Sequence, residues 1–315
     1  MIENNSDTKP VLLLGDGSLA ESIALCLLKA NEVVHFCTSD VRKAKTTLLE
    51  QLAEMKKRNK AVSLERLKFL SSLASVNNYR LAVVITEEDV SKKQQVITDL
   101  ARCLPADAII AINTESISLE AIQQSCLHPE RIIGLNWTEP AHTTRFLEII
   151  RNNQTAETVL DKIKVLAKTW KKDAYVVENF GVRSRMLSAM VREAFYLVEN
   201  GYASVEDIDR ACRNDAGYYL PFAGNCRYMD LMGTYAYGMV MKDLNPDLSR
   251  EKRLPQFFVD ILSEGGNGME NGKGLYNYTP EEKAQWQETF REFSFRIEEI
   301  IDKYPFNYQH NGTHA

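Results

Sequence analysis

The chain has 315 residues, which is enough for two domains with hydrophobic cores of their own. A net charge of −5 argues against general nucleic-acid binding, and no apolar run is long enough to span a bilayer, so no membrane partner is expected. Six cysteines without a Cys-x-x-Cys pair, and a polar start without the apolar core of a signal peptide, favour a reducing, cytoplasmic location and no metal site.

Short apolar runs and helical patterns alternate over the first part of the chain. The apolar runs are typical of buried strands, and the segments between them have the spacing of helices. The expected strands are 11–14, 32–36, 80–86, 108–113, 131–136 and 174–177, and the expected helices are 18–30, 41–62, 92–104, 118–126 and 155–171. This alternation predicts an α/β domain over residues 1–180, with a doubly wound parallel sheet and helices on both faces.

Only helical periodicity follows residue 181. Ser204 is a hydroxyl cap with acids in the next turn, and Leu220-Pro221-Phe222 is expected to break the chain. The other expected helices are 182–199, 228–241, 255–264 and 280–304. We therefore predict an all-α second domain over residues 181–308 and a polar, frayed tail over residues 309–315.

A glycine turn between the first strand and the first helix is the strongest functional signal. Residues 15–20 fit Gly-x-Gly-x-x-Ala, in which Gly15 permits a tight turn, Gly17 lets a pyrophosphate approach the backbone, and Ala20 keeps helix and strand close. Free N–H groups at the helix start, around Ser18 and Leu19, face the phosphates. The motif in this context predicts a Rossmann-type dinucleotide site.

Residues beside this turn bear on which dinucleotide binds. Asp16 puts a carboxylate near the expected pyrophosphate, where like charges repel. Cys37 stands at the end of the second strand, where an acid would hold the ribose hydroxyls, and Asp40 is close enough to substitute. In the alternative, a 2′-phosphate is received by neighbouring hydroxyls and cations, namely Thr38, Ser39, Arg42 and Lys43. NAD is the predicted cofactor, and NADP stays open.

In a sheet of this kind, ligands bind at the carboxyl ends of the strands. Besides the glycine turn, that edge carries residues 86–88, 113–116 and 136–140. Glu87 and Asn113 are therefore candidates for contact with the cofactor. For Glu87 the alternative is an acid at a helix start, where the helix dipole favours it.

Several longer motifs resemble the 3-hydroxyacyl-CoA dehydrogenase family over nearly the whole chain. They are the glycine turn, NTESIS at 113–118, GLNWTEPAH at 134–142 followed by FLEII at 146–150, the long segment 184–211, MDLMG at 229–233 and GKGLYNY at 272–278. The resemblance implies NAD-dependent oxidation of a 3-hydroxyacyl-CoA and a helical second domain that builds a homodimer. The chain also resembles the gulonate dehydrogenase/lambda-crystallin branch, which implies a free hydroxy acid as the small-molecule substrate.

The resemblance also implies four catalytic positions. A histidine takes the hydroxyl proton, a glutamate stabilises that histidine, and a serine and an asparagine hold substrate oxygens. Glu148 matches the glutamate, whereas Asn136 stands at the histidine position, Glu115 at the serine position and Ser184 at the asparagine position. Because an asparagine amide accepts no proton near neutral pH, the family's general base is absent.

Two replacements for that base are open. In the first, Glu115 and Glu148 face each other, so that repulsion and burial raise the pKa of one of them and make one carboxylate a base. Alternatively, Glu115 pairs with Arg183, Arg185 or a lysine and has no chemical role. His142, six residues after Asn136, is a second and weaker candidate for a displaced base.

Three functions follow from this sequence. The first is an NAD(P)-dependent oxidoreductase that converts a 3-hydroxyacyl-CoA or related 3-hydroxy acid to the 3-oxo product with an altered catalytic pair. The second is a dehydrogenase of the gulonate type. The third is a catalytically silent family member that binds a dinucleotide or acyl-CoA. Fold alone does not decide among them, because function depends on the site.

Overall fold

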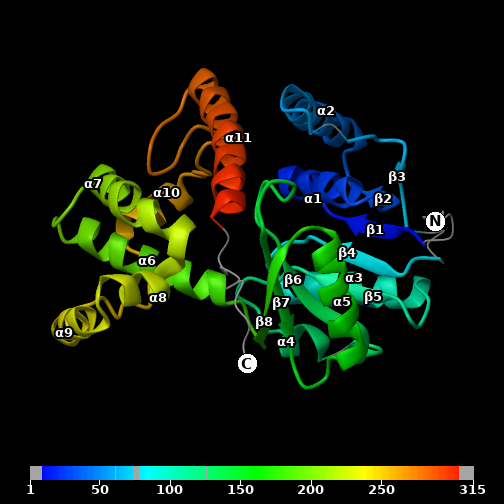
Figure 1. Cartoon of the computed structure of the whole chain (residues 1–315), viewed down its shortest axis with the longest axis horizontal. Coiled ribbons are helices and arrows are strands. Elements are labelled where there is room, and N and C mark those ends of the chain that lie inside the picture. Colours follow the sequence, from blue (N-terminus) through cyan, green and yellow to red (C-terminus); the bar gives the residue numbers. More distant parts are fainter. Residues whose placement is uncertain (1–8, 61, 74–77, 125, 305–315) are drawn as a thin grey trace, which may run out of the picture. The chain divides into compact units, whose positions relative to one another are not determined.

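The structure is a computed structural model that describes residues 9–60, 62–73, 78–124 and 126–304 (Figure 1). The predicted tail over 309–315 lies outside the described residues. The chain separates into two compact units that divide between Ser184 and Arg185. The sequence predicts this division between residues 180 and 181, at the start of the same helix.

The first unit is built on an eight-stranded sheet with the order β3-β2-β1-β4-β5-β6-β7-β8. Neighbouring strands are parallel, except that β6 and β7 are antiparallel. The strands are β1 (Val11–Leu14), β2 (Val34–Cys37), β3 (Leu67–Leu70), β4 (Leu81–Val84), β5 (Ile109–Ile112), β6 (Ile132–Asn136), β7 (Phe146–Arg151) and β8 (Asp173–Glu178). The predicted α/β class with a Rossmann-type sheet is confirmed.

The central strands are apolar along their whole length because helices cover both faces of the sheet. Every residue of β4 and β5 is buried, as a parallel sheet enclosed on both sides requires. The covering helices are α1 (Gly17–Lys29), α2 (Val41–Lys57), α3 (Val90–Cys103), α4 (Leu119–Gln123) and α5 (Glu157–Thr169), with the single 3-10 turn η1 at Pro129–Arg131. In α1, Ala20, Ile23 and Leu27 are fully buried.

Two strands were absent from the sequence prediction. β3 is a short edge strand beside β2. β7 returns antiparallel to β6 because only nine residues, 137–145, separate the two strands, which is too few for a crossover helix. This return pairs Asn136 with Glu148, and the parallel pairing of β7 with β8 places Tyr175 on the other side of Glu148.

The named elements of the described second unit are all helices, as predicted for an all-α domain, and the loop before α11 adds two isolated bridges, from Lys273 to Gly268 and Asn277. Its elements are α6 (Val182–Glu199, whose first turn belongs to the first unit), α7 (Val205–Ala211), the π-helical segment η2 (Cys212–Ala216), α8 (Gly217–Met232), α9 (Thr234–Leu244), α10 (Gln256–Ser263) and α11 (Pro280–Lys303). Ser204 and Thr279 begin α7 and α11 as reciprocal capping boxes.

The expected break at Leu220-Pro221-Phe222 lies elsewhere. Pro221 is inside α8, and the non-helical residue is Gly224, with φ 66° and ψ −177°. Pro221, the fifth residue of α8, removes one main-chain N–H without ending the helix, whereas the positive φ at residue 224 is a conformation that favours glycine.

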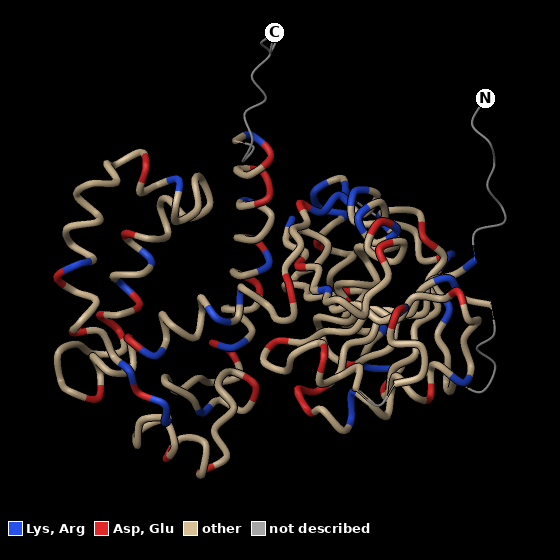
Figure 2. Tube along the Cα trace, turned by 90° about the horizontal axis from the view of Figure 1, so that it is seen from below, with Lys and Arg blue, Asp and Glu red and all other residues tan. Residues whose placement is uncertain are grey.

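Charged residues of both signs are spread along the two units. Figure 2 shows Lys and Arg interspersed with Asp and Glu along the described chain, in keeping with the small net charge of −5. Among the described helices, none is long and apolar enough to cross a membrane.

Candidate functional site

The turn after β1 brings two glycines to the carboxyl ends of the central strands. The Gly15 N–H donates to the Cys37 carbonyl over 3.1 Å, and a Cβ at Gly15 would lie 2.8 Å from the carbonyl oxygen of Ile85. Gly17 begins α1 with φ +84°, and a Cβ there would meet nothing within 4 Å. Close packing thus excludes a side chain at Gly15, and the space beside Gly17 is open to a ligand.

The start of α1 presents backbone donors beside that space. The first N–H groups of a helix, here around Ser18 and Leu19, have no acceptor within the helix. Asp16 is the N-cap residue, but its side chain makes no capping hydrogen bond. Ala20 is buried, and its Cβ lies 3.5 Å from where a Gly15 Cβ would be. The positive end of the helix dipole therefore faces a position suited to an anion.

The Asp16 carboxylate, which the sequence places near the expected pyrophosphate, is bonded to the segment that follows β2 and not to the helix start. Its Oδ1 accepts hydrogen bonds from Thr38 Oγ1 at 2.6 Å, Ser39 N at 2.7 Å and Ser39 Oγ at 2.9 Å. Partial burial raises the pKa of Asp16, but these hydrogen bonds outweigh it and hold the pKa below its usual value. An ionised carboxylate thus lies beside the end of β2.

Cys37, the last residue of β2, supplies no charge at that position. Its thiol is partly buried, and burial together with the charge of Asp16 raises its pKa. Asp40 begins α2, and its Oδ1 accepts a hydrogen bond from the Lys43 N–H at 2.9 Å. The acid that the sequence offered as a substitute is therefore a helix cap.

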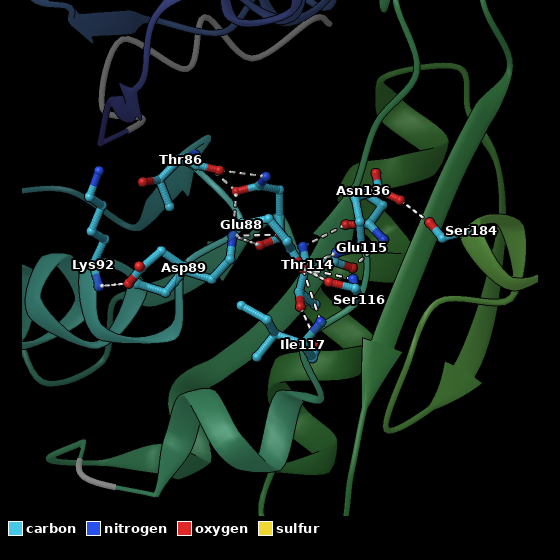
Figure 3. A network of polar contacts seen from close by, with 12 residues as sticks. Thr86, Glu88, Asp89, Lys92, Thr114, Glu115, Ser116, Ile117, Asn136 and Ser184 are labelled. Atoms are coloured by element: carbon cyan, nitrogen blue, oxygen red, sulfur yellow. Dashed lines mark hydrogen bonds and ion pairs between the residues drawn. The ribbon is translucent and has the colours of Figure 1, made fainter. Parts of the chain in front are cut away.

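The two acids that follow β4 have different surroundings, and Figure 3 shows Glu88 beside the loop that carries Glu115. Glu87 is exposed and pairs with Lys92. Glu88 points toward the loop after β5, where its Oε1 accepts the N–H groups of residues 115, 116 and 117 at 2.9, 2.7 and 3.0 Å. Its Oε2 lies 3.2 Å from the Nζ of Lys93, whose side chain is fully buried. Glu88, rather than Glu87, fixes the loop that carries Glu115.

Asn113 joins the ends of β4 and β5. Its amide accepts the Thr86 N–H and donates to the Thr86 carbonyl, both over 2.9 Å. Lys93 Nζ donates to the Asn113 carbonyl at 2.7 Å. The side chain of Asn113 therefore holds this edge of the sheet in register.

Asn136 is fully buried, and each polar atom of its amide has a partner. Its Oδ1 accepts the Thr114 N–H at 2.8 Å, and its Nδ2 donates to the Thr114 carbonyl at 2.7 Å and to Glu148 Oε2 at 2.9 Å. The amide thus holds the end of β5 and orients Glu148, but it has no site for a proton.

Glu148, also fully buried, caps the start of α6. Its Oε1 accepts the N–H groups of Val182 at 2.8 Å and Arg183 at 3.1 Å, and the Tyr175 hydroxyl at 2.9 Å. A Cβ at Gly181 would lie 2.6 Å from Oε2, so this approach needs glycine. Burial, the hydrogen bond to Glu148 and the charge of Glu148 raise the pKa of Tyr175, so its hydroxyl keeps its proton.

Glu115 and Ser184 meet each other, and Arg183 joins them to the buried pair. The Ser184 hydroxyl donates to the Glu115 carboxylate (Figure 3). Arg183 Nη1 lies 3.1 and 3.2 Å from the two oxygens of that carboxylate. The same arginine donates its main-chain N–H to Glu148. All four predicted catalytic positions therefore form one network, and Glu115 has the arginine partner that the sequence offered as its alternative.

His142 is not a proton acceptor near neutral pH. Its side chain is buried, and burial, with nearby Lys29 and Lys172, lowers its pKa to about 3. His35 lies on β2, and His128 is exposed beside Glu130. His310 and His314 lie outside the described residues.

Both units match models of known protein families. Residues 10–180 match the model of the 3-hydroxyacyl-CoA dehydrogenase NAD-binding domain, and residues 182–278 match that of the 3-hydroxyacyl-CoA dehydrogenase C-terminal domain. The chain belongs to the 3-hydroxyacyl-CoA dehydrogenase family. The resemblance inferred from the motifs is confirmed, and the first unit is the NAD-binding domain of an oxidoreductase family.

The chain is similar to several curated proteins with different names. A 5-formyl-3-hydroxy-2-methylpyridine 4-carboxylate 5-dehydrogenase from Mesorhizobium japonicum is 31% identical over 220 residues, which cover 68% of this chain and 70% of that protein. A probable 3-hydroxybutyryl-CoA dehydrogenase from Bacillus subtilis is 25% identical over 290 residues, 88% of this chain and 99% of that protein. The chain spans only 39% of the peroxisomal bifunctional enzymes that it also matches.

A solved structure confirms the fold over almost the whole length. The crystal structure of a 5-formyl-3-hydroxy-2-methylpyridine 4-carboxylic acid 5-dehydrogenase, described as an NAD+-dependent dismutase, has a TM-score of 0.87. The superposition covers 94% of this chain and 99% of that one, at 23% identity.

Sequence reasoning missed three residues of the network. Glu88, Lys93 and Tyr175 were not singled out, although each contacts a predicted site residue or its loop. A signal was present for Glu88, because it adjoins Glu87 at a strand end. Tyr175 is placed beside Glu148 by the pairing of β7 with β8, which no pattern in the sequence indicates.

Proposed function

We propose that the protein is an NAD-dependent oxidoreductase that oxidises the hydroxyl group of a small acid or its thioester, with Glu115 as the proton acceptor. The observation that carries this proposal is the contrast between the two carboxylates of the network. The side chain of Glu115 is 36% exposed at the carboxyl end of β5, whereas Asn136 and Glu148 are fully buried and hydrogen-bonded.

The residues around the glycine turn fit the cofactor. The open space beside Gly17 and the uncapped N–H groups at the start of α1 suit a pyrophosphate. We propose that Gly15, Gly17, Ser18, Leu19 and Ala20 hold the dinucleotide. Further contacts are proposed for Cys37, Thr38, Glu87 and Asn113. NAD, when bound, accepts a hydride from the carbon that carries the substrate hydroxyl.

The chain's own residues then handle the proton. Glu115 takes the hydroxyl proton while the carbon loses its hydride, so the alcohol becomes a carbonyl. Arg183 and Ser184 hold the Glu115 carboxylate in one orientation. Asn136 and Glu148 have a positioning role, because they fix Thr114 and the start of α6 on either side of Glu115.

Three substrate classes are to be compared. Family membership supports a 3-hydroxyacyl-CoA or related 3-hydroxy acid, which is our first choice. The gulonate-type alternative is a free hydroxy acid. The relative from Mesorhizobium japonicum is named for a pyridine carboxylate that carries a formyl group, so the third class is an aromatic aldehyde acid, whose hydrate, formed by addition of water, carries the hydroxyl group to be oxidised.

The second unit supports assembly as a homodimer. α6 has no buried residue. Large hydrophobic side chains are exposed on several of its helices, and apolar surface of this kind, where it is contiguous, marks sites of protein–protein contact. They include Met186, Leu187, Met190, Val191, Leu231, Met232, Val240 and Met241. A cytoplasmic location remains a prediction from cysteine usage.

A second candidate function is supported by the buried pair itself. With Asn136 and Glu148 fully hydrogen-bonded, the positions that the family uses for catalysis have a structural role here. We propose as the alternative a catalytically silent family member that binds a dinucleotide or acyl-CoA.

Turnover and binding distinguish these functions. Absorbance at 340 nm follows NADH formation with a panel of the three substrate classes, and a separate titration measures NADH binding. The oxidoreductase predicts turnover that falls at least about 100-fold in Glu115→Gln but not in Glu120→Gln, an exposed acid on α4. NADH binding without turnover on any substrate supports the silent member. Turnover that survives Glu115→Gln contradicts Glu115 as the acceptor.

A further inference from the structure

The end of β2 has an acid beside it, but that acid comes from another strand. Dinucleotide-binding folds of this type commonly place an acidic residue there to bind the ribose hydroxyls. In this chain Cys37 ends β2, and its partly buried thiol carries no charge. The carboxylate beside it belongs to Asp16, which follows β1 by two residues.

The pairing of β1 with β2 explains why Asp16 reaches this place. Leu14 and Cys37 are partners in parallel register, so the chain leaves both strands side by side at one edge of the sheet. The Gly15 N–H donates to the Cys37 carbonyl and extends this pairing by one residue. Asp16 therefore leaves β1 opposite Thr38 and Ser39, which leave β2.

The carboxylate is held through one of its two oxygens. Three donors from Thr38 and Ser39 converge on Oδ1, at 2.6 to 2.9 Å. Within the described part of the chain no residue donates to Oδ2, and the Asp16 side chain is exposed. Asp16 is thus fixed in orientation, with one oxygen available to a ligand and the open space of Gly17 next to it.

We propose that Asp16 binds the hydroxyl pair of the adenosine ribose and makes the protein select NAD over NADP. This inference rests on the proposed function, since it takes a dinucleotide on the glycine turn as given. A carboxylate oxygen accepts hydrogen bonds from the ribose hydroxyls of NAD. In NADP a phosphate replaces one of these donors and brings negative charge next to Asp16, which repels it.

Cations near this edge define the competing possibility. Arg42 and Lys43 are exposed in the first turn of α2, where the sequence left them as ligands for a 2′-phosphate. Neither is a partner of Asp16, whose Oδ1 accepts hydrogen bonds from residues 38 and 39 within the described part of the chain. If these cations dominated, NADP would bind more tightly than NAD.

Titration calorimetry of the full chain with NADH and with NADPH tests the proposal. We expect the wild type to bind NADH at least about 100-fold more tightly, and Asp16→Asn to reduce that ratio at least about tenfold by weakening NADH and strengthening NADPH. Thr38→Val removes one of the bonds that hold Asp16 and should reduce the ratio by a smaller factor of about three. Asp40→Asn removes the same charge at the α2 cap, and the ratio should not change.

Three outcomes would contradict the proposal. An unchanged ratio in Asp16→Asn, with tight binding of NADH, removes Asp16 as the selecting residue but leaves the proposed function intact. A wild type that prefers NADPH assigns the site to Arg42 and Lys43. Binding of neither dinucleotide overturns both the inference and the proposed function. If circular dichroism shows that Asp16→Asn does not fold, the ratio in Thr38→Val decides.

Discussion

The side-chain nitrogen of Asn136 donates a hydrogen bond to Glu148 over 2.9 Å, at the last residue pair of the antiparallel strands β6 and β7. The family places a proton acceptor and its partner at these two positions. Here the pair is an amide and a carboxylate, both fully buried, which bind the ends of three elements together. The two side chains predicted as a catalytic pair are therefore held in contact, and the amide at position 136 has no capacity to accept a proton.

The buried pair should therefore contribute strongly to stability. Asn136→Ala removes three hydrogen bonds and leaves the Thr114 main chain and one oxygen of Glu148, Oε2, without these partners, which should lower the free energy of unfolding by about 3 kcal/mol. Urea denaturation measures the loss. Asn153→Ala, at an exposed position after β7, is the matched control and should leave the midpoint unchanged. A loss in Asn136→Ala as small as in the control contradicts a structural role.

Glu88 and Glu87 offer a sharper comparison, because they are neighbours with different surroundings. Glu88→Gln leaves the fully buried Lys93 without its counter-charge and should cost about 2 to 4 kcal/mol, whereas Glu87→Gln, at an exposed ion pair, should have no measurable effect. Urea denaturation of both variants checks this. Equal effects of the two substitutions would show that Glu88 does not fix the loop.

The pH dependence of Glu88 provides its control. Partial burial raises the pKa of this carboxyl, but hydrogen bonds from Ser116 and Ile117 and the charge of Lys93 outweigh it and lower the pKa. A group with a lowered pKa stabilises the fold above its unfolded pKa and loses that contribution as pH falls through the folded one. The difference in the free energy of unfolding between wild type and Glu88→Gln should therefore become smaller as the pH is lowered.

The sequence predicted the buried parallel strands well and the short ones poorly. β4 and β5 are continuous apolar runs, which only a strand enclosed on both faces or a buried helix produces. β7 has Glu148 at its centre, and that charge interrupts the pattern. β3 has four residues at an edge, where propensity is weak and tertiary pairing decides.

The predicted site residues are brought together, but the sequence does not show which of them form hydrogen bonds with one another. Strand order places the segments after β4, β5 and β6 at one edge, as the rule for such sheets states. The direction of Asp16, toward Thr38 instead of the helix start, depends on a side-chain rotamer that no pattern encodes. The choice between Glu87 and Glu88 likewise depends on which of two adjacent acids points inward.

Glu21 should make stability depend on pH in the opposite direction. Burial raises the pKa of this α1 carboxyl to about 7, with Glu139 and Asp16 adding to the effect and Lys43 opposing it. Its Oε2 is buried and has no hydrogen-bond partner among the described residues. Below the pKa that this group has in the unfolded chain, it does not change the free energy of unfolding. As pH rises from there toward the higher pKa of the folded state, the free energy of unfolding falls.

Glu21→Gln removes that cost. The free energy of unfolding of the variant should rise relative to that of the wild type by on the order of 1 to 2 kcal/mol between about pH 4.5 and pH 7. Above that range the difference should stay constant. Thermal or urea unfolding over this range measures the difference, with the exposed Glu50→Gln as a control whose difference stays flat. A constant offset for Glu21→Gln across the range would contradict a titration of this carboxyl.

The exposed apolar side chains of α6 should pack against a second copy of the chain. Met186 and Met190 are separated by one helical turn, lie on the same side of the helix, and are 59% and 49% exposed. Light scattering after size exclusion should give twice the chain mass of 35.8 kDa for the wild type, and the mass of one chain for Met186→Lys with Met190→Lys. Charges placed in an apolar interface lose hydration without gaining partners, which favours dissociation.

Val165→Lys alters an apolar residue of α5 that is 64% exposed in the first unit, and it should leave the mass doubled. A wild type with the mass of one chain, or a double variant that stays doubled, would remove this face of α6 as the dimer contact.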